Sequence, residues 1–559
     1  MDTVYLVLIL LFVASATGVA TRFLPSLPTP LILIGFGAVI AWPASGLHVE
    51  LEPELFMLLF IAPLLFADAR RFPQREFMIL RGPILALALG LVLVTVIGVG
   101  YFVHWLFPAL PLAVCFALTA ILSPTDAVAV SAISGRLPVP PRLMHILEGE
   151  SLMNDASGLV AFKFAVAAAL TGAFSLTDAA SGFFIISVGG IFVGIALALA
   201  FNFVRTRLIE RRLGEASTIQ VVLLLLLLPF AAFLLAEHFH MSGILSAVAA
   251  GMVINRKDLK RQDQTSTRIQ ARSVWEMLEF VLNALVFLLL GFQLPEIIGG
   301  ALHFSERNGG AYEFIELLGY VVLISTALLG MRFVWICGAT YLPKLISPKA
   351  EVRVVSKRVM LAGTLAGIRG TITLAAALSL PELMNDGTPF PARELLIFLA
   401  TGVILFTLVS GSIGLPLVLR NLDLPKDSKE FEEEHDARVK GAEAAIRRIE
   451  QYSQEKSKTL ADHKGHEEVI IAFNEVILQL MDYYHKRLEV NSNEVSESVV
   501  AARRELERET RLQALKAERG EYYRLRSKNI INDSTLRKLV REVDLVETAL
   551  NASIAETGH

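Results

Sequence analysis

The strongest constraint on this chain is a series of long apolar segments that repeats along its first three quarters. A helix needs about 20 apolar residues to cross the hydrocarbon core of a bilayer, and fewer where it is broken and rests on its neighbours. Thirteen segments meet this requirement, and the pattern predicts an all-α polytopic membrane protein in contact with the lipid bilayer. They start near Val4, Thr29, Leu51, Met78, Pro111, Arg142, Ala179, Thr218, Ser242, Val274, Tyr312, Val359 and Glu394, and the last ends near Leu419.

Charge is distributed unevenly between the two ends of the sequence. Of the 559 residues, 54% are hydrophobic and 19% are charged, yet residues 425–559 hold roughly half of all Lys, Arg, Asp and Glu. We therefore predict a transmembrane domain over residues 1–424 and a soluble helical domain over residues 425–559. The net charge of -3 is too close to neutral to favour a nucleic-acid partner. Cys115 and Cys337 fall in apolar stretches, and we expect no metal cluster and no cofactor.

Lys and Arg in the connecting loops predict the orientation, because these cations accumulate on the cytoplasmic side of a membrane. Basic loops alternate with cation-poor loops along the thirteen segments. This alternation predicts an amino terminus outside the cell and a cytoplasmic carboxyl-terminal domain, in the inner (plasma) membrane. The basic loops contain Arg70, Arg71 and Arg75; Arg136 and Arg142; Arg205, Arg207, Arg211 and Arg212; Arg256, Lys257, Lys260 and Arg261; and Lys344, Lys349, Arg353, Lys357 and Arg358.

Two apolar segments are interrupted at matching positions in the two halves of the domain. The fifth contains Ser123-Pro124-Thr125-Asp126, and the twelfth contains Gly363 and then Gly367-Ile368-Arg369-Gly370-Thr371. If six segments are followed by one connecting segment, the next six cross the membrane in the opposite orientation. We therefore predict an inverted six-helix repeat with broken helices 5 and 12. Broken helices expose carbonyl groups and amide dipoles that can coordinate ions. A purely structural role, in which Pro and Gly only permit kinks and close packing, fits the same pattern.

Charged side chains inside the apolar segments are the first candidates for function, since each costs roughly 2.5–3.5 kcal/mol at the centre of a membrane helix. The densest group opens the sixth segment, from Glu148 to Asp155. Ser151 and Asp155 are four residues apart and would share one helical face. Glu150 and Asn154 would share the neighbouring face. Oxygen ligands of this kind suit a hard cation such as sodium and offer nothing soft for a transition metal.

Structural roles compete with functional ones at several of these charges. We interpret Glu150 as the partner of Arg369, a pair that would balance two buried charges without touching an ion. Asp126 stands where the second half of the fifth helix restarts, so capping of that helix competes with ion ligation. Asp68 is either an interfacial acid or a contributor to the cytoplasmic approach. Asp155 has no basic residue one turn away and lies among Ala, Gly and Ser, so a structural role is hardest to find there.

Four motifs give the chain a resemblance to a known family. Gly149-Glu150-Ser151-Leu152-Met153-Asn154-Asp155 resembles the Gly-Glu-Ser-Leu-X-Asn-Asp signature of the monovalent cation:proton antiporter-1 family, in its bacterial sodium/proton antiporter type. Residues 123–126, 236–244 and 367–370 agree with further stretches of that family in order and spacing. The resemblance covers about the first 420 residues. It implies the thirteen-helix inverted-repeat fold, a homodimer, and elevator-like alternating access.

Positions carried over from the resemblance assign roles to individual residues. They imply that Asp155 binds the ion and accepts the proton. The residues implied to shape the site are Ser151, Asn154 and Thr125, with Ser151 and Thr125 as further sodium ligands. Asp126 is implied as the crossover residue.

Two further positions follow from the same resemblance. It implies that Glu150 and Arg369 form the structural ion pair. Asn283 stands where animal exchangers carry an acid, which favours the bacterial type.

The residues also predict how exchange would work. Burial disfavours the charged form of a carboxylate, so Asp155 can hold either a proton or a cation near neutral pH. Because Asn154 is not a second acid, either one proton or one sodium neutralises the site. We therefore expect a transporter rather than an enzyme, one that exchanges one sodium (or lithium) for one proton in support of pH and sodium homeostasis.

Other functions stay open at this point. A potassium/proton antiporter remains possible because oxygen ligands alone do not set size selectivity. A membrane sensor with a transporter-like core is the alternative from another class, although Asp155 and both helix breaks argue against it. An ATP-driven pump is not supported, because the sequence lacks a phosphate-binding glycine loop followed by Lys-Ser or Lys-Thr.

Overall fold

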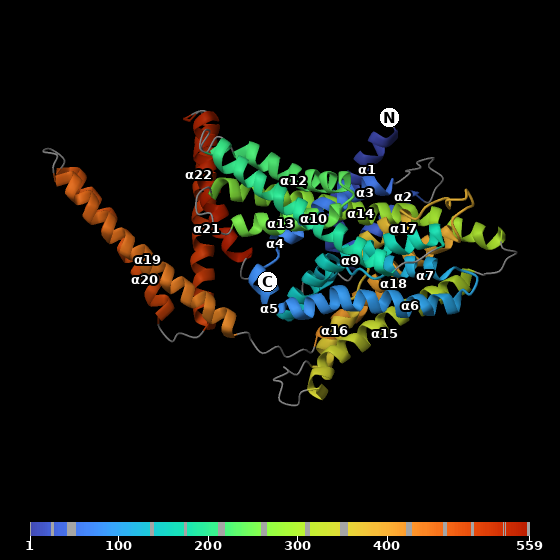
Figure 1. Cartoon of the computed structure of the whole chain (residues 1–559). Helices are drawn as coiled ribbons and strands as arrows, with labels where there is room; N and C mark the ends of the chain where they lie inside the picture. The colour runs from blue at the N-terminus through green and yellow to red at the C-terminus, as the bar shows by residue number, and fades with distance from the viewer. Residues whose placement is uncertain are drawn as a thin grey trace. The chain divides into compact units, whose positions relative to one another are not determined.

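In the computed structural model the regular secondary structure of the described residues is helical, and the chain divides into two compact units, Met1–Leu424 and Pro425–His559 (Figure 1). Within the described ranges no β-strand forms, and one isolated bridge joins Leu383 and Pro389. The described residues are 2–23, 27–41, 52–134, 139–172, 176–210, 218–258, 265–307, 314–346, 356–420, 428–461, 467–492, 497–528, 530–531 and 533–555.

The first unit is built from helices that follow one another in the same order as the apolar segments of the sequence. In the part of this unit that the structure describes, three short π-helical stretches interrupt or extend them, at Met57–Ile61, Ala86–Leu91 and Arg205–Glu210. The α-helices are α1 (Asp2–Phe23), α2 (Thr29–Ala41), α3 (Pro53–Phe56), α4 (Ala62–Arg71), α5 (Gln74–Leu85), α6 (Val92–Leu106), α7 (Leu112–Ile121), α8 (Ala127–Ser134), α9 (Pro141–Thr171), α10 (Leu176–Val204), α12 (Thr218–His238), α13 (Gly243–Asp258), α14 (Thr265–Arg307), α15 (Phe314–Ile346), α16 (Lys357–Leu365), α17 (Thr371–Leu378) and α18 (Arg393–Leu419).

Seven helical stretches among the described residues are long and apolar enough to cross a membrane. Large apolar side chains such as Phe184, Phe192 and Phe203 on α10 are exposed, an arrangement that is favourable in lipid and costly in water. The unit is therefore that of a polytopic membrane protein, while thirteen spans in an inverted repeat remain a prediction. The seven stretches are Gln74–Leu106, Pro141–Thr171, Phe184–Arg207, Ile219–His238, Ile269–Phe304, Phe314–Tyr341 and Arg393–Leu419.

Both predicted helix interruptions are present, and the two unwound stretches meet. Helix α7 ends at Ile121 and α8 begins at Ala127, while α16 ends at Leu365 and α17 begins at Thr371. The backbone N–H of Asp126 donates to the carbonyl oxygen of Ile368 at 2.8 Å, which links one break to the other. Because an apolar interior offers no water to an unpaired backbone group, this bond stabilises both breaks at once.

Arg369 supplies further hydrogen bonds at this crossing. Its Nε donates to the carbonyl oxygen of Leu122 at 2.9 Å, and its Nη1 donates to that of Gly367. Its backbone N–H donates to Thr407 Oγ1 on α18 at 3.1 Å. The side chain is 3% exposed. The guanidinium therefore satisfies carbonyl groups that the unwinding of the two helices leaves without helical donors.

Glu150 on α9 forms its ion pair with Arg332 on α15. The two Nη atoms of Arg332 reach the two carboxylate oxygens, with Nη2 at 2.7 Å from Oε2, and the side chains are 2% and 1% exposed. Arg332 Nε also donates to the carbonyl oxygen of Gly363 at 2.8 Å. A Cβ atom on Gly367 would lie 2.7 Å from Cδ of Arg332, so glycine at this position leaves room for the arginine.

The predicted pair of Glu150 with Arg369 is therefore corrected to Glu150 with Arg332. Both arginines are buried near the twelfth segment, but they have different partners. Arg369 lies within the break itself, where carbonyl groups compete for its donors. Arg332 comes from a neighbouring helix and reaches the carboxylate with the two parallel hydrogen bonds that favour Arg–carboxylate pairs.

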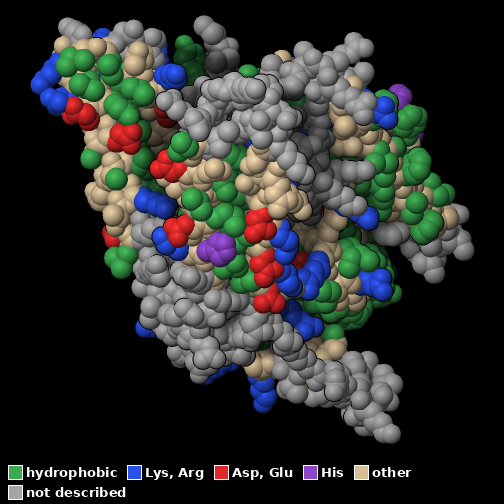
Figure 2. Space-filling view, turned by 90° about the vertical axis from the view of Figure 1, so that its left-hand side faces the viewer, with side chains coloured by type: hydrophobic (Ala, Val, Ile, Leu, Met, Phe, Trp, Pro, Cys, Tyr) green, Lys and Arg blue, Asp and Glu red, His purple; other side chains and the backbone are tan. Residues whose placement is uncertain are grey.

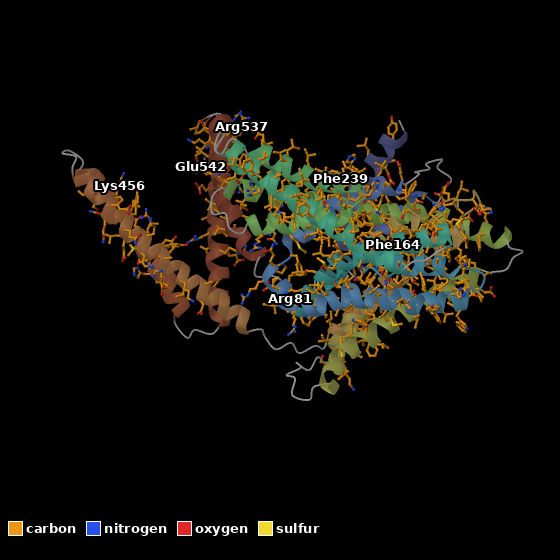
Figure 3. The ribbon with its side chains drawn as sticks, viewed as in Figure 1. Arg81, Phe164, Phe239, Lys456, Arg537 and Glu542 are labelled. Carbon is orange, nitrogen blue, oxygen red and sulfur yellow. The ribbon has the colours of Figure 1, made fainter. Side chains whose placement is uncertain are left out.

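The described residues of the second unit form four helices, α19 (Ser428–Ala461), α20 (Glu467–Ser492), α21 (Glu497–Ser527) and α22 (Asp533–Ala555). Helix α19 packs on α20, where the rings of Tyr452 and Phe473 lie 6.2 Å apart, and α21 packs on α22. Arg519 of α21 binds Asp544 at 2.8 Å and also Glu547, both on α22. This unit is rich in surface charge. Figure 2 shows acidic and basic side chains beside hydrophobic ones on one face of the molecule, and Figure 3 labels the exposed Lys456, Arg537 and Glu542.

Helix α22 is partly buried within its own unit. Val543 is 4% exposed and Leu539 and Val540 are half-buried, in the helix that packs on α21. Val546, three residues further along the helix, is 50% exposed. The buried side of α22 is therefore narrow.

Arg332→Met should strongly destabilise the first unit, because it leaves the Glu150 carboxylate buried without its partner, at a cost of about 3–5 kcal/mol. The measurement is the thermal unfolding temperature of the protein in detergent. A matched control is Arg272→Met, which removes an exposed i,i+4 pair with Glu276 worth only about 0.3–0.5 kcal/mol. Adding Glu150→Gln to Arg332→Met should recover part of the loss. Equal unfolding temperatures for Arg332→Met and Arg272→Met would contradict the assignment.

Candidate functional site

A cavity of about 40 Å³ lies beside the point where the two helix breaks meet. Its volume is enough for one or a few water-sized species. It brings together side chains from α4, α9, α14, α17 and the first break. Its polar lining consists of Asp68, Thr125, Asp126, Ser151, Asp155, Asn283 and Thr373.

Asp155 is the buried carboxylate at this cavity. It lies on α9, is 3% exposed, and does not take part in any ion pair that the described residues form. Ser151, one turn earlier on α9, lines the same cavity, which agrees with the shared face that the sequence predicts. Ser151 Oγ also accepts a long hydrogen bond of 3.4 Å from the backbone N–H of Ala127, at the start of α8. A carboxylate and a hydroxyl therefore face one small space.

Asn154 and Thr125 form a chain of hydrogen bonds that leads to the ion pair. Asn154 Nδ2 donates to Thr125 Oγ1 at 2.9 Å, and Thr125 Oγ1 donates to Glu150 Oε1 at 3.3 Å. Asn154 is 1% exposed, and its Oδ1 atom has no hydrogen-bond partner among the described residues. This chain holds the first break against α9. It also uses the Thr125 hydroxyl, although Thr125 itself lines the cavity.

Asp126 caps the amino-terminal end of α8, the helix that follows the first break. Its Oδ1 accepts hydrogen bonds from the backbone N–H groups of Val128 at 2.8 Å and Ala129 at 3.0 Å. Of the two roles that the sequence leaves open for Asp126, this contact is the helix cap. The carboxylate also lines the cavity. A Cβ atom on Gly370 would collide with the Asp126 carboxylate, so the glycine lets the two breaks approach each other.

Asp68 lies at the junction between this cavity and a larger one. The second cavity has a volume of about 430 Å³ and shares Asp68, Ser151 and Asn283 with the first. It is lined in addition by Arg71, Glu148, Glu276 and Glu279. Arg71 Nη1 binds Glu279 Oε2 at 2.6 Å, so part of the acidic lining is neutralised. Because the two cavities share lining residues, they place several carboxylate groups along the way to Asp155.

Two residues at or near the site were not found by sequence reasoning. Arg332 is the partner of Glu150, but a lone arginine in an apolar segment indicates only that it must pair with some other helix. Thr373 contributes a buried hydroxyl to the cavity. Threonine is common in membrane helices, so its presence near the Gly370 break is a weak signal.

The oxygen atoms gathered here suit a monovalent hard cation. Carboxylate and hydroxyl groups are ligands for alkali and alkaline-earth ions, and no group of three or more His, Cys, Asp or Glu residues with metal-site geometry occurs in the described part of the chain. A carboxylate that lacks a fixed cationic partner can be neutralised either by a proton or by a cation. The arrangement therefore fits ion and proton exchange at one group.

Comparison with known proteins places the chain among transporters. A family model described as "Sodium/hydrogen exchanger, transmembrane" matches residues 7–421. YjcE of Escherichia coli, an uncharacterized Na⁺/H⁺ exchanger, is 43% identical over 554 residues, with 98% of this chain and 99% of that relative covered. A Bacillus subtilis antiporter named for sodium, potassium, lithium, rubidium and protons is 45% identical over 420 residues, with 75% of this chain and 62% of that relative covered.

Solved structures agree on the fold. The sodium proton antiporter MjNhaP1 from Methanocaldococcus jannaschii at pH 8 aligns with a TM-score of 0.55 and 19% sequence identity, covering 76% of this chain and 99% of that one. At this identity the likeness concerns the fold alone. Together with the family model, which spans almost the whole first unit, it leads to one conclusion: this chain belongs to the sodium/hydrogen exchanger family of monovalent cation:proton antiporters.

Proposed function

We propose that this protein exchanges one sodium or lithium ion for one proton across the cell membrane. The observation that carries the proposal is Asp155, a buried carboxylate outside the ion pairs of the described residues, facing a small cavity with Ser151. The family membership supports antiport, and the carboxylate and hydroxyl oxygens among the polar lining residues of the cavity suit a hard cation such as sodium.

Potassium is the second candidate substrate. The Bacillus subtilis relative, which is 45% identical to this chain, carries potassium and rubidium in its name beside sodium and lithium. The cavity lining contains no feature that by itself selects for ion size. A sensor with a transporter-like core is less favoured, because the Asp155 cavity and both helix breaks are intact.

In the proposed mechanism, the cation and the proton compete for Asp155. Binding of sodium by Asp155 and Ser151, with the carbonyl groups of the first break within the same region, favours the ionised carboxylate. An empty site favours the protonated form, because a bare buried charge is costly. If both loaded forms cross between inward-facing and outward-facing states and the empty anion does not, exchange is coupled.

The other site residues have supporting roles in this proposal. Asn154 and Thr125 fix the first break through Glu150 and its partner Arg332. Asp126 caps α8, and Arg369 satisfies carbonyl groups at the crossing. Asp68 and the larger acidic cavity form the cytoplasmic approach to the site.

The wider arrangement is also part of the proposal. We place thirteen spans in an inverted repeat, with the amino terminus outside and residues 425–559 as a cytoplasmic helical domain. The protein acts as a homodimer in the inner (plasma) membrane, and its bundle of α7, α8, α9, α16 and α17 moves against the remaining helices. Its role is sodium and pH homeostasis. These assignments rest on loop charge, on the two breaks and on the family.

Asp155→Asn should insert normally and lose exchange completely, because the substitution keeps the volume and removes the titratable group. Cation-driven fluorescence dequenching in everted vesicles measures the exchange. Asp386→Asn is the matched control. Asp386 is an exposed carboxylate outside the spans, and hydrogen bonds from Thr388 lower its pKa, which keeps it ionised. The Asp386→Asn variant therefore loses one negative charge, as Asp155→Asn does, but away from the site. Normal exchange by a well-inserted Asp155→Asn protein would rule out the proposed carrier.

Competition between sodium and protons predicts a specific pH dependence. As pH falls, the half-maximal sodium concentration should rise by up to about tenfold per pH unit, since protons occupy the same carboxylate. The same titrations with lithium and potassium give the selectivity order, with sodium and lithium expected ahead of potassium. A half-maximal sodium concentration that is constant across pH 6 to 9 would mean that the two ions bind different groups.

One-for-one exchange predicts that the membrane potential does not bias transport, because a full cycle moves no net charge. Proteoliposomes with and without a potassium potential set by valinomycin test this, with sodium-driven pH change as the readout. We expect equal rates at both signs of the potential. A strong dependence on sign would show that a second carboxylate, such as Asp126 or Asp68, also carries a proton.

A further inference from the structure

We infer that the Thr373 hydroxyl on α17 is a direct ligand of the transported cation and helps to set its affinity and selectivity. This inference rests on the proposed function, because it concerns the ion that Asp155 would bind. It adds a ligand from the second broken helix to a site that the sequence motifs place on the fifth and sixth segments.

The first observation is that Thr373 lines the same cavity as Asp155 and Ser151. Its side chain is 1% exposed, and its Oγ1 atom has no hydrogen-bond partner among the described residues. An unsatisfied buried hydroxyl is costly, since it has lost its hydrogen bonds to water and gained none in return. A ligand in the cavity would supply the missing interaction.

The helix break explains why this hydroxyl is available. Buried threonines in helices commonly donate to the carbonyl group four residues earlier, as Thr364 does to Met360 and Thr407 to Val403. Four residues before Thr373 stands Arg369, which belongs to the unwound stretch that precedes α17. The carbonyl group of Arg369, which would be the usual acceptor, is therefore not in helical position. This leaves the Thr373 hydroxyl free to bind an ion.

The chemistry of a neutral oxygen determines what this ligand can do. A hydroxyl presents lone pairs to a hard cation without adding charge, whereas Asp155 supplies the charge that the cation or proton neutralises. Thr373 therefore changes the affinity for cations and the preference among them, but not the number of protons exchanged. Because it comes from α17 and Asp155 comes from α9, a cation bound by both links the two helices.

Thr373→Val tests the inference, because valine keeps the shape and removes the hydroxyl. The half-maximal sodium concentration for exchange should rise about fivefold, the factor that corresponds to one lost interaction of hydrogen-bond strength. Electroneutrality should be retained, because the lost hydroxyl carries no charge. The lithium and sodium titrations should shift by different factors, and sodium should stabilise the detergent-purified variant against heat less than it stabilises the wild type.

Three further variants make the result specific. Thr373→Ser retains the hydroxyl and should bind sodium like the wild type, whereas Thr373→Ala should repeat the effect of valine if the valine variant folds poorly. Thr401→Val is the matched control, because Thr401 on α18 is also buried at 2% exposure with an unpartnered hydroxyl, but it is not among the residues lining the cavity. It should leave the half-maximal sodium concentration unchanged.

The outcomes separate this inference from the proposed function. If Asp155→Asn is inactive while Thr373→Val and Thr373→Ala bind sodium like Thr401→Val, the hydroxyl is no ligand and only this inference fails. The inference would also fail if Thr373→Ser raised the half-maximal sodium concentration as much as Thr373→Val does. If Asp155→Asn still exchanges sodium for protons, the proposed function itself fails.

Discussion

Backbone groups in an apolar interior must find partners within the protein, and this requirement governs the centre of the first unit. Two helices are unwound there, at residues 122–126 and 366–370, and each break removes helical hydrogen bonds. The Asp126 N–H bonds the carbonyl of Ile368, the Asp126 carboxylate caps α8, and the Arg369 guanidinium bonds the carbonyl groups of Leu122 and Gly367. These bonds make the breaks stable enough to hold a cavity between them, so the geometry of the site depends on them.

The same balance explains why two buried acids on one helix have different roles. Glu150 and Asp155 lie on α9 and are 1% and 3% exposed. Glu150 is neutralised by Arg332 and also accepts a hydrogen bond from Thr125, so its charge is held permanently. Asp155 faces the cavity and has no such cation among the described residues. A permanently paired carboxylate contributes to structure, whereas one without a fixed cation can exchange what neutralises it.

Much of this arrangement could be predicted from the sequence, and the exceptions have physical causes. Helical geometry places Ser151 and Asp155 on one face, and Pro and Gly indicate both breaks, because these features depend on local spacing. The partner of Glu150 could not be predicted in this way. Arg332 and Arg369 are both single arginines in apolar segments, and sequence separation carries no information on which helix lies beside α9. The role of the Thr373 hydroxyl could not be predicted for a related reason. The sequence does not show where the second break ends, so it does not show that the hydroxyl lacks its helical acceptor.

The division between charged and neutral groups in the cavity has a further consequence for transport. In the proposed mechanism, Asp155 carries the charge that must be neutralised before the site can cross a low-dielectric barrier, so it determines how many charges move in a cycle. Ser151 is neutral, as is Thr373, so under the same proposal substitutions there alter which cation binds best without altering that count. The proposal therefore assigns coupling and selectivity to separate side chains. A relative could change its preferred cation through the hydroxyl groups alone while keeping the same stoichiometry, because the carboxylate and the hydrogen-bonded breaks beside it would be unchanged.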